Sequence, residues 1–282
     1  MRKICVINQK GGVGKTTTTL NIAAGLSRHG RRVLVIDFDA QGNIGHCLNI
    51  EGEKDIYHLI SENAEIQECT KRLGENLHII PSRETLTKTE VLIAQQENRE
   101  FILKEKLADL KGYDYVLIDC PPSLGLLNQN AMLFAQEAFI PVTTDHLGYD
   151  ALVKMTKVIE TINKTFRHNI RITKVIPTMF DQRINTCKVH LDKISSLLYE
   201  ATTIPVRVNS KLKEAPLEGK SIFSYAPQST GAQDYMKITR TIIDEEQRVL
   251  AGYVEGPEEN LVPLNSPEVM EEFKKKNEPI KV

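Results

Sequence analysis

With 282 residues, the chain is long enough for one large α/β domain or two small ones. Hydrophobic residues make up 41% and charged residues 26%, as in ordinary soluble globular proteins, and no apolar run approaches the ~18 residues of a transmembrane helix. The first residues lack a signal-peptide pattern, and the five cysteines form no C-x-x-C pair. These features argue against zinc and iron–sulfur sites and favour a reducing, cytoplasmic compartment.

The net charge of −1 conceals an uneven distribution. Residues 150–250 carry 16 Lys and Arg against 11 Asp and Glu, whereas residues 1–149 carry 16 against 19 and residues 251–282 carry 4 against 7. A polyanion would therefore dock most readily on the middle section, although solvated helix faces produce the same excess.

The first motif is a glycine-rich turn between a predicted strand and a predicted helix. The apolar run Ile4–Ile7 predicts a buried strand, and the apolar positions within Leu20–Leu26 have helical spacing. Glycines let consecutive backbone N–H groups wrap an anion, and the following helix presents its positive dipole end to that anion. The order strand, glycine turn, helix is that of a phosphate-binding loop. Its predicted nucleotide-binding residues are Lys10, Gly11, Gly12, Val13, Gly14, Lys15, Thr16 and Thr17.

Two residues of this loop have assigned chemistry. Lys15 is expected to reach the β- and γ-phosphates, and the Thr16 hydroxyl is expected to bind Mg²⁺. Gln9 stands where the general pattern requires its first glycine, and Lys10 opens the run Lys-Gly-Gly-Val-Gly-Lys-Thr-Thr. This is the deviant Walker A form, which is much more specific than the general one.

Two acidic residues follow the next predicted strand. Val33–Ile36 is a continuous apolar run, typical of a parallel strand covered on both faces, and Asp37 and Asp39 stand at its end. Alternation places both carboxylates on the same side of the extended chain. Because the carboxyl ends of parallel strands line the ligand crevice of an open α/β sheet, both acids are expected to face the phosphates.

A second apolar strand ending in an acid is predicted at Tyr115–Asp119. This is the Walker B arrangement, which places Asp119 near the metal, through water. Pro121 and Pro122 should stop the strand, and Ser123 is expected to cap the next helix.

The remaining segments complete an alternation of strands and helices. Residues 44–75 are expected to form short helices and loops, and the other predicted elements are strands at Leu77–Pro81, Ala138–Val142 and Arg171–Pro177, a helical stretch from about Glu84 to Leu110 broken near Asn98, a helix after Gly148, and a final helix from about Gly231 to Leu250. The pattern predicts a single α/β domain over residues 1–250, with a mostly parallel, doubly wound sheet and helices on both faces.

The last residues differ in composition from the rest. Residues 251–282 are rich in Pro, Glu and Lys and are expected to be mobile or loosely docked. One short helix could form from Ser266 to Lys276, but its apolar stripe is too small and its charge too weakly basic for a membrane anchor.

The phosphate-binding loop, Ile36–Asn43 and Leu117–Gly125 together resemble the ParA/Soj branch of the ParA/MinD ATPases, and the resemblance covers residues 1 to about 249. It implies a P-loop NTPase that binds ATP and Mg²⁺, with Lys10, Lys15 and Asp39 as catalytic residues. In the family, the acid at the Asp39 position orients and activates the attacking water, and the acid at Asp37 supports the magnesium shell and the loop. The implied metal residues are Thr16, Asp39 and Asp119.

The resemblance also assigns residues outside the phosphate site. The equivalent of Lys10 crosses a two-fold interface to the phosphates of the partner chain. Met179, Pro205 and Asn209 correspond to family positions near the adenine, and this sequence has about two extra residues between the last two. Basic residues that contact DNA phosphates without reading sequence correspond to Arg183 and Lys211, with weaker candidates at Lys188, Lys213 and Lys220.

The resemblance thus implies a DNA-partition ATPase. ATP would drive sandwich homodimerisation and non-specific DNA binding on the nucleoid, and a ParB-type centromere-binding partner would stimulate hydrolysis; no membrane is expected. The principal alternative is a MinD-like or cargo-positioning ATPase that acts on a membrane or protein scaffold. A reductase like the nitrogenase iron protein would need a second cysteine to accompany Cys120, and a metabolic synthetase would need a substrate pocket that the sequence does not define.

Overall fold

The computed structural model describes residues 1–250, except 49, 51 and 52. The chain divides into the units Met1–Thr241 and Ile242–Val282, and the strands of the described residues all lie in the first. The predicted tail, residues 251–282, lies outside the described residues, so the boundary near residue 250 stays a prediction.

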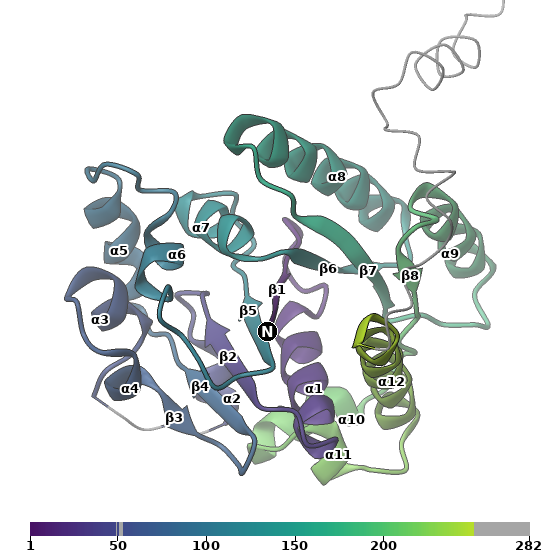
Figure 1. The fold of residues 1–282 in the computed structure, drawn as a ribbon. Coiled ribbons are helices and arrows are strands. Elements are labelled where there is room, and N and C mark those ends of the chain that lie inside the picture. Colours follow the sequence, from purple (N-terminus) through teal and green to yellow (C-terminus); the bar gives the residue numbers. More distant parts are fainter. Residues whose placement is uncertain (49, 51–52, 251–282) are drawn as a thin grey trace, which may run out of the picture. The chain divides into compact units, whose positions relative to one another are not determined.

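Strands and helices alternate along the described chain (Figure 1). The strands are β1 (Arg2–Val6), β2 (Val33–Asp37), β3 (Lys71–Arg72), β4 (Leu77–Ile80), β5 (Tyr115–Asp119), β6 (Glu137–Thr143), β7 (Arg171–Thr178) and β8 (Thr202–Thr203). The helices are α1 (Lys15–Arg28), α2 (Asn43–Cys47), α3 (Ile56–Ser61), α4 (Ile66–Cys69), α5 (Leu86–Ile93), α6 (Ile102–Lys106), α7 (Leu126–Phe134), α8 (His146–Phe166), α9 (Asn185–Leu197), α10 (Lys211–Glu214), the 3-10 helix η1 (Ala215–Glu218), α11 (Ile222–Tyr225) and α12 (Thr230–Leu250).

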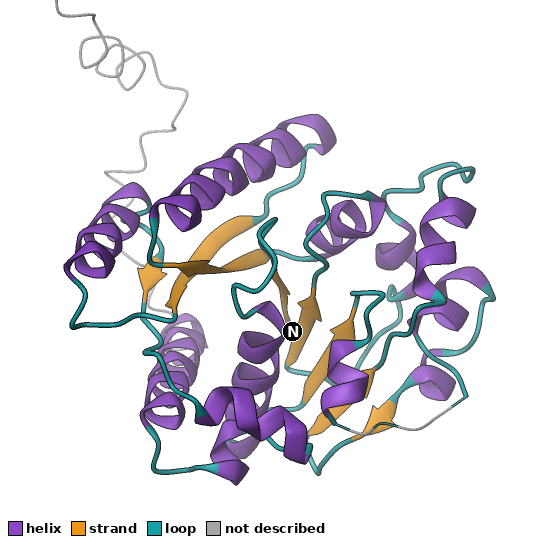
Figure 2. Ribbon diagram, turned by 180° about the vertical axis from the view of Figure 1, so that it is seen from behind, coloured by secondary structure: helices purple, strands orange, loops and turns teal. Residues whose placement is uncertain are grey.

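Within the described residues, eight strands form one sheet in the order β3-β4-β2-β5-β1-β6-β7-β8. The pairings are parallel except that between β3 and β4, which is antiparallel. Figure 2 shows the strands running between layers of helices. The predicted fold class, a mostly parallel α/β sheet covered by helices, is therefore confirmed.

The alternation of side chains along the central strands separates core residues from site residues. Ile36 of β2 and Val116 and Ile118 of β5 belong to the apolar core that includes residues of α7 and α8. Asp37 and Asp119 have the opposite parity and so project to the face covered by α1. The two acids are also direct neighbours in the β2–β5 register, which places them beside the first turn of α1.

Most predicted elements are confirmed, with shifts at their ends. The helical stretch predicted from Glu84 to Leu110 is α5 followed by α6, and the break contains Asn98, whose φ is +55°. The segment predicted as short helices and loops contains α2, α3 and α4, but also the strand β3, which adds to the sheet edge through β4. Two-residue strands have too little periodicity for detection from sequence.

The predicted helix cap at Ser123 is wrong. Helix α7 begins at Leu126, and its N-cap residue is Gly125, which offers no side chain for capping. The backbone carbonyl of Ser123 instead accepts a hydrogen bond from the Asn128 side chain, which also donates to Pro121 O at 3.0 Å. The chain therefore needs three further residues after the Pro-Pro pair before the helix can start.

Helix α8 begins two residues before Gly148. Asp145 is its N-cap, and one carboxylate oxygen accepts a hydrogen bond from Gly148 N at 2.7 Å.

Among the described residues, no helix combines the length and apolar character that crossing a membrane requires.

Candidate nucleotide site

The predicted phosphate-binding loop joins β1 to α1. Gly12 and Gly14 have φ values of +71° and +87°, in the left-handed region that favours glycine, and Gly14 is the N-cap residue of α1. A Cβ atom at Gly12 would meet nothing within 4 Å, so backbone conformation and not space requires glycine there. The loop therefore turns directly into the positive end of α1.

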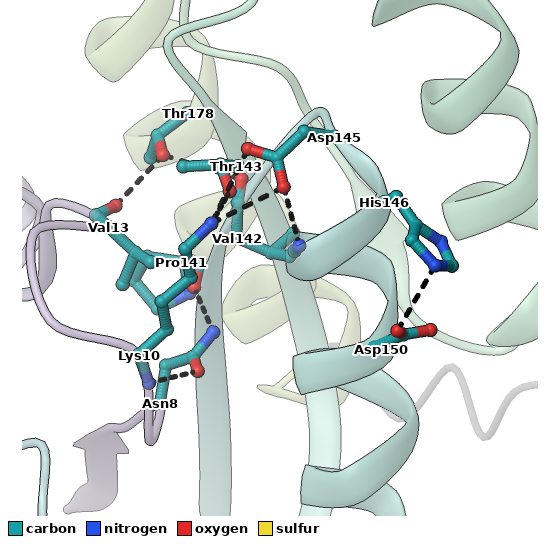
Figure 3. Close-up of polar contacts among 11 residues, drawn as sticks. Asn8, Lys10, Val13, Pro141, Val142, Thr143, Asp145, His146, Asp150 and Thr178 are labelled. Carbon is teal, nitrogen blue, oxygen red and sulfur yellow. Dashed lines mark hydrogen bonds and ion pairs between the residues drawn. The ribbon is translucent and has the colours of Figure 1, made fainter.

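Hydrogen bonds hold this loop against the carboxyl ends of β6 and β7 (Figure 3). The buried Asn8 side chain donates to Pro141 O at 2.7 Å and accepts from Lys10 N at 3.0 Å. The Thr178 hydroxyl donates to Val13 O at 2.8 Å. Hydrogen bonds to β6 and β7, which come much later in the chain, thus hold both ends of the loop.

Lys15 lies within the loop and is only 8% exposed. Its ammonium group donates to Lys10 O at 3.4 Å. Burial lowers the pKa of Lys15, and the nearby carboxylates of Asp119 and Asp39 partly offset this effect. An enclosed cation beside the loop amides is arranged to bind phosphate oxygens.

The structure brings the predicted metal residues Thr16 and Asp119 into direct contact. The Thr16 hydroxyl donates to one Asp119 oxygen at 2.7 Å, and the Thr19 hydroxyl donates to the other at 3.2 Å. Burial raises the pKa of Asp119 to about 7, although both hydroxyls and Lys15 work in the opposite direction. Hydroxyl and carboxylate oxygens are the donors that Mg²⁺ prefers, so these residues fit magnesium.

The described residues contain no group of three or more His, Cys, Asp or Glu side chains that could hold a metal ion. Magnesium at this site would therefore need phosphate oxygens and water to complete its octahedral shell, as in other sites that bind it together with a nucleotide. Thr16 and Asp119 would hold the ion, which would neutralise charge on the phosphates.

Asp37 and Asp39 have different environments. Asp37 is fully buried, and its two oxygens accept hydrogen bonds from Asp39 N and Ile44 N, each at 3.1 Å. Burial and the neighbouring Asp119 raise the pKa of Asp37 well above its ordinary value. Asp39 is 8% exposed and accepts from Gln41 N at 3.0 Å. Asp37 therefore shapes the loop that carries Asp39, and Asp39 reaches the cavity.

A cavity of about 940 Å³ opens over the loop and the outer face of α1. Predicted residues on its wall are Gly11, Gly12, Gly14, Lys15, Thr16, Thr17, Asp39, Met179 and Lys220. Several other wall residues have no signal in the sequence motifs, among them Asn21, Ser27, Arg28, Leu48 and Ser224. Gly219, on the cavity wall, has φ of +63°. In the sequence, a glycine at this position indicates a tight turn.

The three residues predicted near the adenine lie in different surroundings. Met179 lines the cavity, is 47% exposed and has φ of +53°, an unusual conformation for a non-glycine residue. Pro205 and Asn209 are not part of the cavity wall. The Asn209 side chain donates to Thr230 Oγ1 at 2.6 Å and accepts from Lys211 N at 2.8 Å.

Two of the predicted DNA-binding residues lie on or just before α9. The Arg183 side chain is 84% exposed and forms a two-pronged ion pair with Asp181, at 2.7 Å between its closest atoms. This pair, through hydrogen bonds from Arg183, lowers the pKa of Asp181. Lys188 pairs with no carboxylate among the described residues.

The other three predicted DNA-binding residues follow β8. Lys211 pairs with Glu214 at 2.7 Å, and Lys220, on the cavity wall, lies 3.9 Å from Glu218. In the part of the chain that the structure describes, Lys213 has no carboxylate partner. The Arg183 guanidinium and the Lys211 ammonium are thus already paired with nearby carboxylates.

The Asp119 carboxyl group is expected to destabilise the empty protein at neutral and higher pH. Because its folded pKa lies near 7 and the unfolded value near 4, stability falls as pH rises from about 4 to about 7. Asn at this position keeps an oxygen for one of the two threonines, and its NH2 group can donate to the hydroxyl of the other. Without Mg²⁺ and nucleotide, Asp119→Asn should raise the melting temperature at pH 8, by about 2–4 °C per kcal/mol gained, and have little effect at pH 4 to 5.

Asp114→Asn is the control with the opposite sign. Its pKa is lowered, chiefly by a hydrogen bond from Arg32, so its carboxylate contributes stability at pH 8. Calorimetry or circular dichroism at pH 5 and 8 measures both variants. A melting temperature of Asp119→Asn below that of the wild type at pH 8 would contradict the prediction.

Comparison with known proteins agrees with this geometry. Residues 1–172 match the family described as AAA domain. The chromosome partitioning protein ParA of Myxococcus xanthus is 35% identical over 251 residues, covering 87% of this chain and 89% of ParA. The sporulation initiation inhibitor protein Soj of Bacillus subtilis is 36% identical over 247 residues, covering 85% of this chain and 97% of Soj.

A solved structure shows the same fold in an enzyme of a different name. Cobyrinic acid a,c-diamide synthase from Mycobacterium smegmatis, with a bound ATP analog and magnesium, superimposes with a TM-score of 0.74 at 27% identity, covering 88% of this chain and 96% of the synthase. The curated relatives are similar over nearly their full length at higher identity. The chain therefore belongs to the ParA/Soj family of partition ATPases.

Proposed function

We propose that the protein is an ATP-dependent DNA-partition ATPase whose ATP-bound homodimer binds DNA without sequence preference. The observation that carries the proposal is the convergence of Lys15, the Thr16–Asp119 pair and Asp39 at the start of α1. ATP and Mg²⁺ are the ligands that this set of groups fits. Lys15 binds phosphate oxygens, Thr16 and Asp119 hold the metal, and Asp39 orients the attacking water.

Dimerisation supplies the group that this arrangement lacks. Hydrolysis needs a further cation on the γ-phosphate, and we assign this role to Lys10 of the opposing chain. ATP that binds the dimer more tightly than the monomer shifts chains toward the dimer by its differential affinity. Loss of the γ-phosphate removes this contact, so hydrolysis weakens the dimer.

DNA binding follows from pairing two weakly basic surfaces. Affinity for DNA grows with the number of phosphates that a protein neutralises, so a dimer binds far better than one chain. Arg183 and Lys211 are the leading candidates, with Lys188, Lys213 and Lys220 as further ones. Since Arg183 and Lys211 are paired with Asp181 and Glu214, DNA phosphates must compete with these carboxylates.

A ParB-type centromere-binding protein is the proposed stimulator of hydrolysis, and the nucleoid in the cytoplasm is the proposed location. The second candidate is a positioning ATPase that acts on a membrane or protein scaffold, because the nucleotide cycle would be the same.

Retention on non-specific duplex DNA with ATP, with ADP and without nucleotide tests the proposal. Binding to liposomes, or an ATP-dependent dimer without DNA retention, would favour the second candidate.

Arg183→Glu should reduce DNA retention by at least tenfold in ATP and leave nucleotide affinity unchanged. Reversal of this charge replaces a phosphate-binding fork by a repelling group on each subunit. Each lost phosphate contact lowers the slope of log affinity against log salt by about 0.9, so about 2 is expected for a dimer. Fluorescence anisotropy across 50–300 mM salt measures both affinity and slope.

Arg171→Glu is the matched control, because Arg171 is exposed at the opposite end of β7 from the cavity. It changes net charge equally and should weaken binding much less. Equal losses in the two variants would sink the assignment of Arg183 and indicate a general effect of net charge.

A further inference from the structure

The Lys10 side chain points to the end of β6 and not into the nucleotide cavity (Figure 3). Its ammonium group donates to Thr143 Oγ1 at 3.0 Å. It also lies 3.3 and 3.4 Å from the two carboxylate oxygens of Asp145. Lys10 is absent from the cavity wall although Gly11 and Lys15 are part of it. In the single chain, the loop lysine is therefore held outside its own nucleotide site.

Asp145, the carboxylate in this contact, is held in place by further hydrogen bonds. Asp145 caps α8 by accepting from Gly148 N at 2.7 Å, and the Thr143 hydroxyl donates to the same carboxyl group. Burial opposes ionisation of Asp145, but these hydrogen bonds and the Lys10 ammonium lower its pKa below the ordinary value. At neutral pH Asp145 therefore presents a negative charge to Lys10.

The backbone of Lys10 is anchored to the same strand. Lys10 N donates to the Asn8 side chain, which in turn donates to the β6 carbonyl of Pro141. The backbone of Lys10, through Asn8, and its side chain are thus both tied to the end of β6, at Pro141 and Thr143. This arrangement limits Lys10 to one side of the loop.

We propose that Asp145 is a positioning residue for Lys10. It holds the Lys10 ammonium at the end of β6 until ATP-driven pairing of two chains draws the ammonium away. The inference rests on the proposed function, since it gives Lys10 a resting partner that competes with the phosphates of the other chain. Each pairing event exchanges two Lys10–Asp145 contacts for two Lys10–phosphate contacts. Asp145 therefore sets how much ATP the chain needs before it pairs.

The size of this effect follows from the exposure of the contact. Lys10 and Asp145 side chains are 31% and 53% exposed. A partly exposed ion pair shifts an equilibrium by about two- to fivefold. Because both chains must release their lysine, the dimerisation constant should change by the square of this factor, on the order of 4- to 25-fold.

Asp145→Asn removes the charge, and its amide oxygen can still accept from Gly148 N. Asp150→Asn is the matched control, because Asp150 lies one turn along α8 and pairs with His146 instead of Lys10. The first readout is acetylation of the Lys10 amine by an N-hydroxysuccinimide ester at pH 7 without nucleotide, followed by peptide mass spectrometry. We expect Lys10 to react about two to five times faster in Asp145→Asn and at the wild-type rate in Asp150→Asn.

The labelling result stands apart from the proposed function, since it needs neither ATP nor a second chain. An unchanged Lys10 rate in Asp145→Asn overturns the proposal. Thr143→Val, which removes the bridging hydroxyl but keeps the branched shape, gives the same test if Asp145→Asn does not fold.

The second readout is the ATP concentration at half-maximal dimerisation, measured by light scattering at one protein concentration. Asp145→Asn should need less ATP than the wild type, and Asp150→Asn the same amount. An unchanged or higher requirement overturns the competition between Asp145 and phosphate. A wild-type chain that never pairs with ATP would instead refute the proposed function, and the labelling rates would still decide the resting contact.

Discussion

Lys10→Ala should slow ATP hydrolysis on DNA by a factor on the order of 10³–10⁵ and leave ADP affinity within a few-fold. The expected loss is large because a cation on the γ-phosphate acts mainly on the transition state. Affinity for ADP should persist because Lys15 and the loop amides, not Lys10, face the cavity. Phosphate release and titration with a fluorescent ADP analogue measure the two quantities.

Lys157→Ala is the control for Lys10→Ala, since Lys157 is exposed in the middle of α8. It should hydrolyse ATP at the wild-type rate. A Lys10→Ala rate within tenfold of the wild type would mean that the lysine is not the missing cation.

Asp39→Ala should bind ATP normally but hydrolyse it about 10²–10⁴ times more slowly. The carboxylate is on the cavity wall and accepts from Gln41 N, so the substitution removes the proposed water-orienting group without removing a proposed phosphate ligand. The ATP-bound state should consequently last longer, and retention on DNA should be prolonged. Single-turnover hydrolysis of prebound ATP measures the chemical step directly.

Asp39→Asn separates the carboxylate's chemistry from its structural hydrogen bond. Its amide oxygen can still accept from Gln41 N, so the loop should keep its shape while hydrolysis stays slow. Wild-type hydrolysis by Asp39→Asn would show that the negative charge is not needed.

The phosphate loop and the acids were predictable because each depends on a short stretch of sequence. Apolar runs at Val33–Ile36 and Tyr115–Asp119 specify buried strands, and an acid at each end needs only strand parity to be placed. The contact between Thr16 and Asp119 then follows from the order of β2, β5 and β1 in the sheet.

The elements between β7 and α12 were not predictable in the same way. Helix α9 buries only Ile194 fully, so its apolar periodicity is weak. The four-residue helix α11 depends on a contact from far along the chain, in which Ile222 N donates to the Asn21 side chain. The Lys10–Asp145 contact joins residues 135 positions apart, and no local pattern marks such a pair.

The adjacency of Asp37 and Asp119 across β2 and β5 has a consequence for how the sequence can change. Two buried carboxyl groups side by side cost the empty fold stability, since burial and mutual repulsion disfavour their charged forms. Variation that improves folding alone would replace one of them by a neutral residue. In the proposed function both acids serve nucleotide turnover, so selection for a robust fold and selection for catalysis would act on these positions in opposite directions.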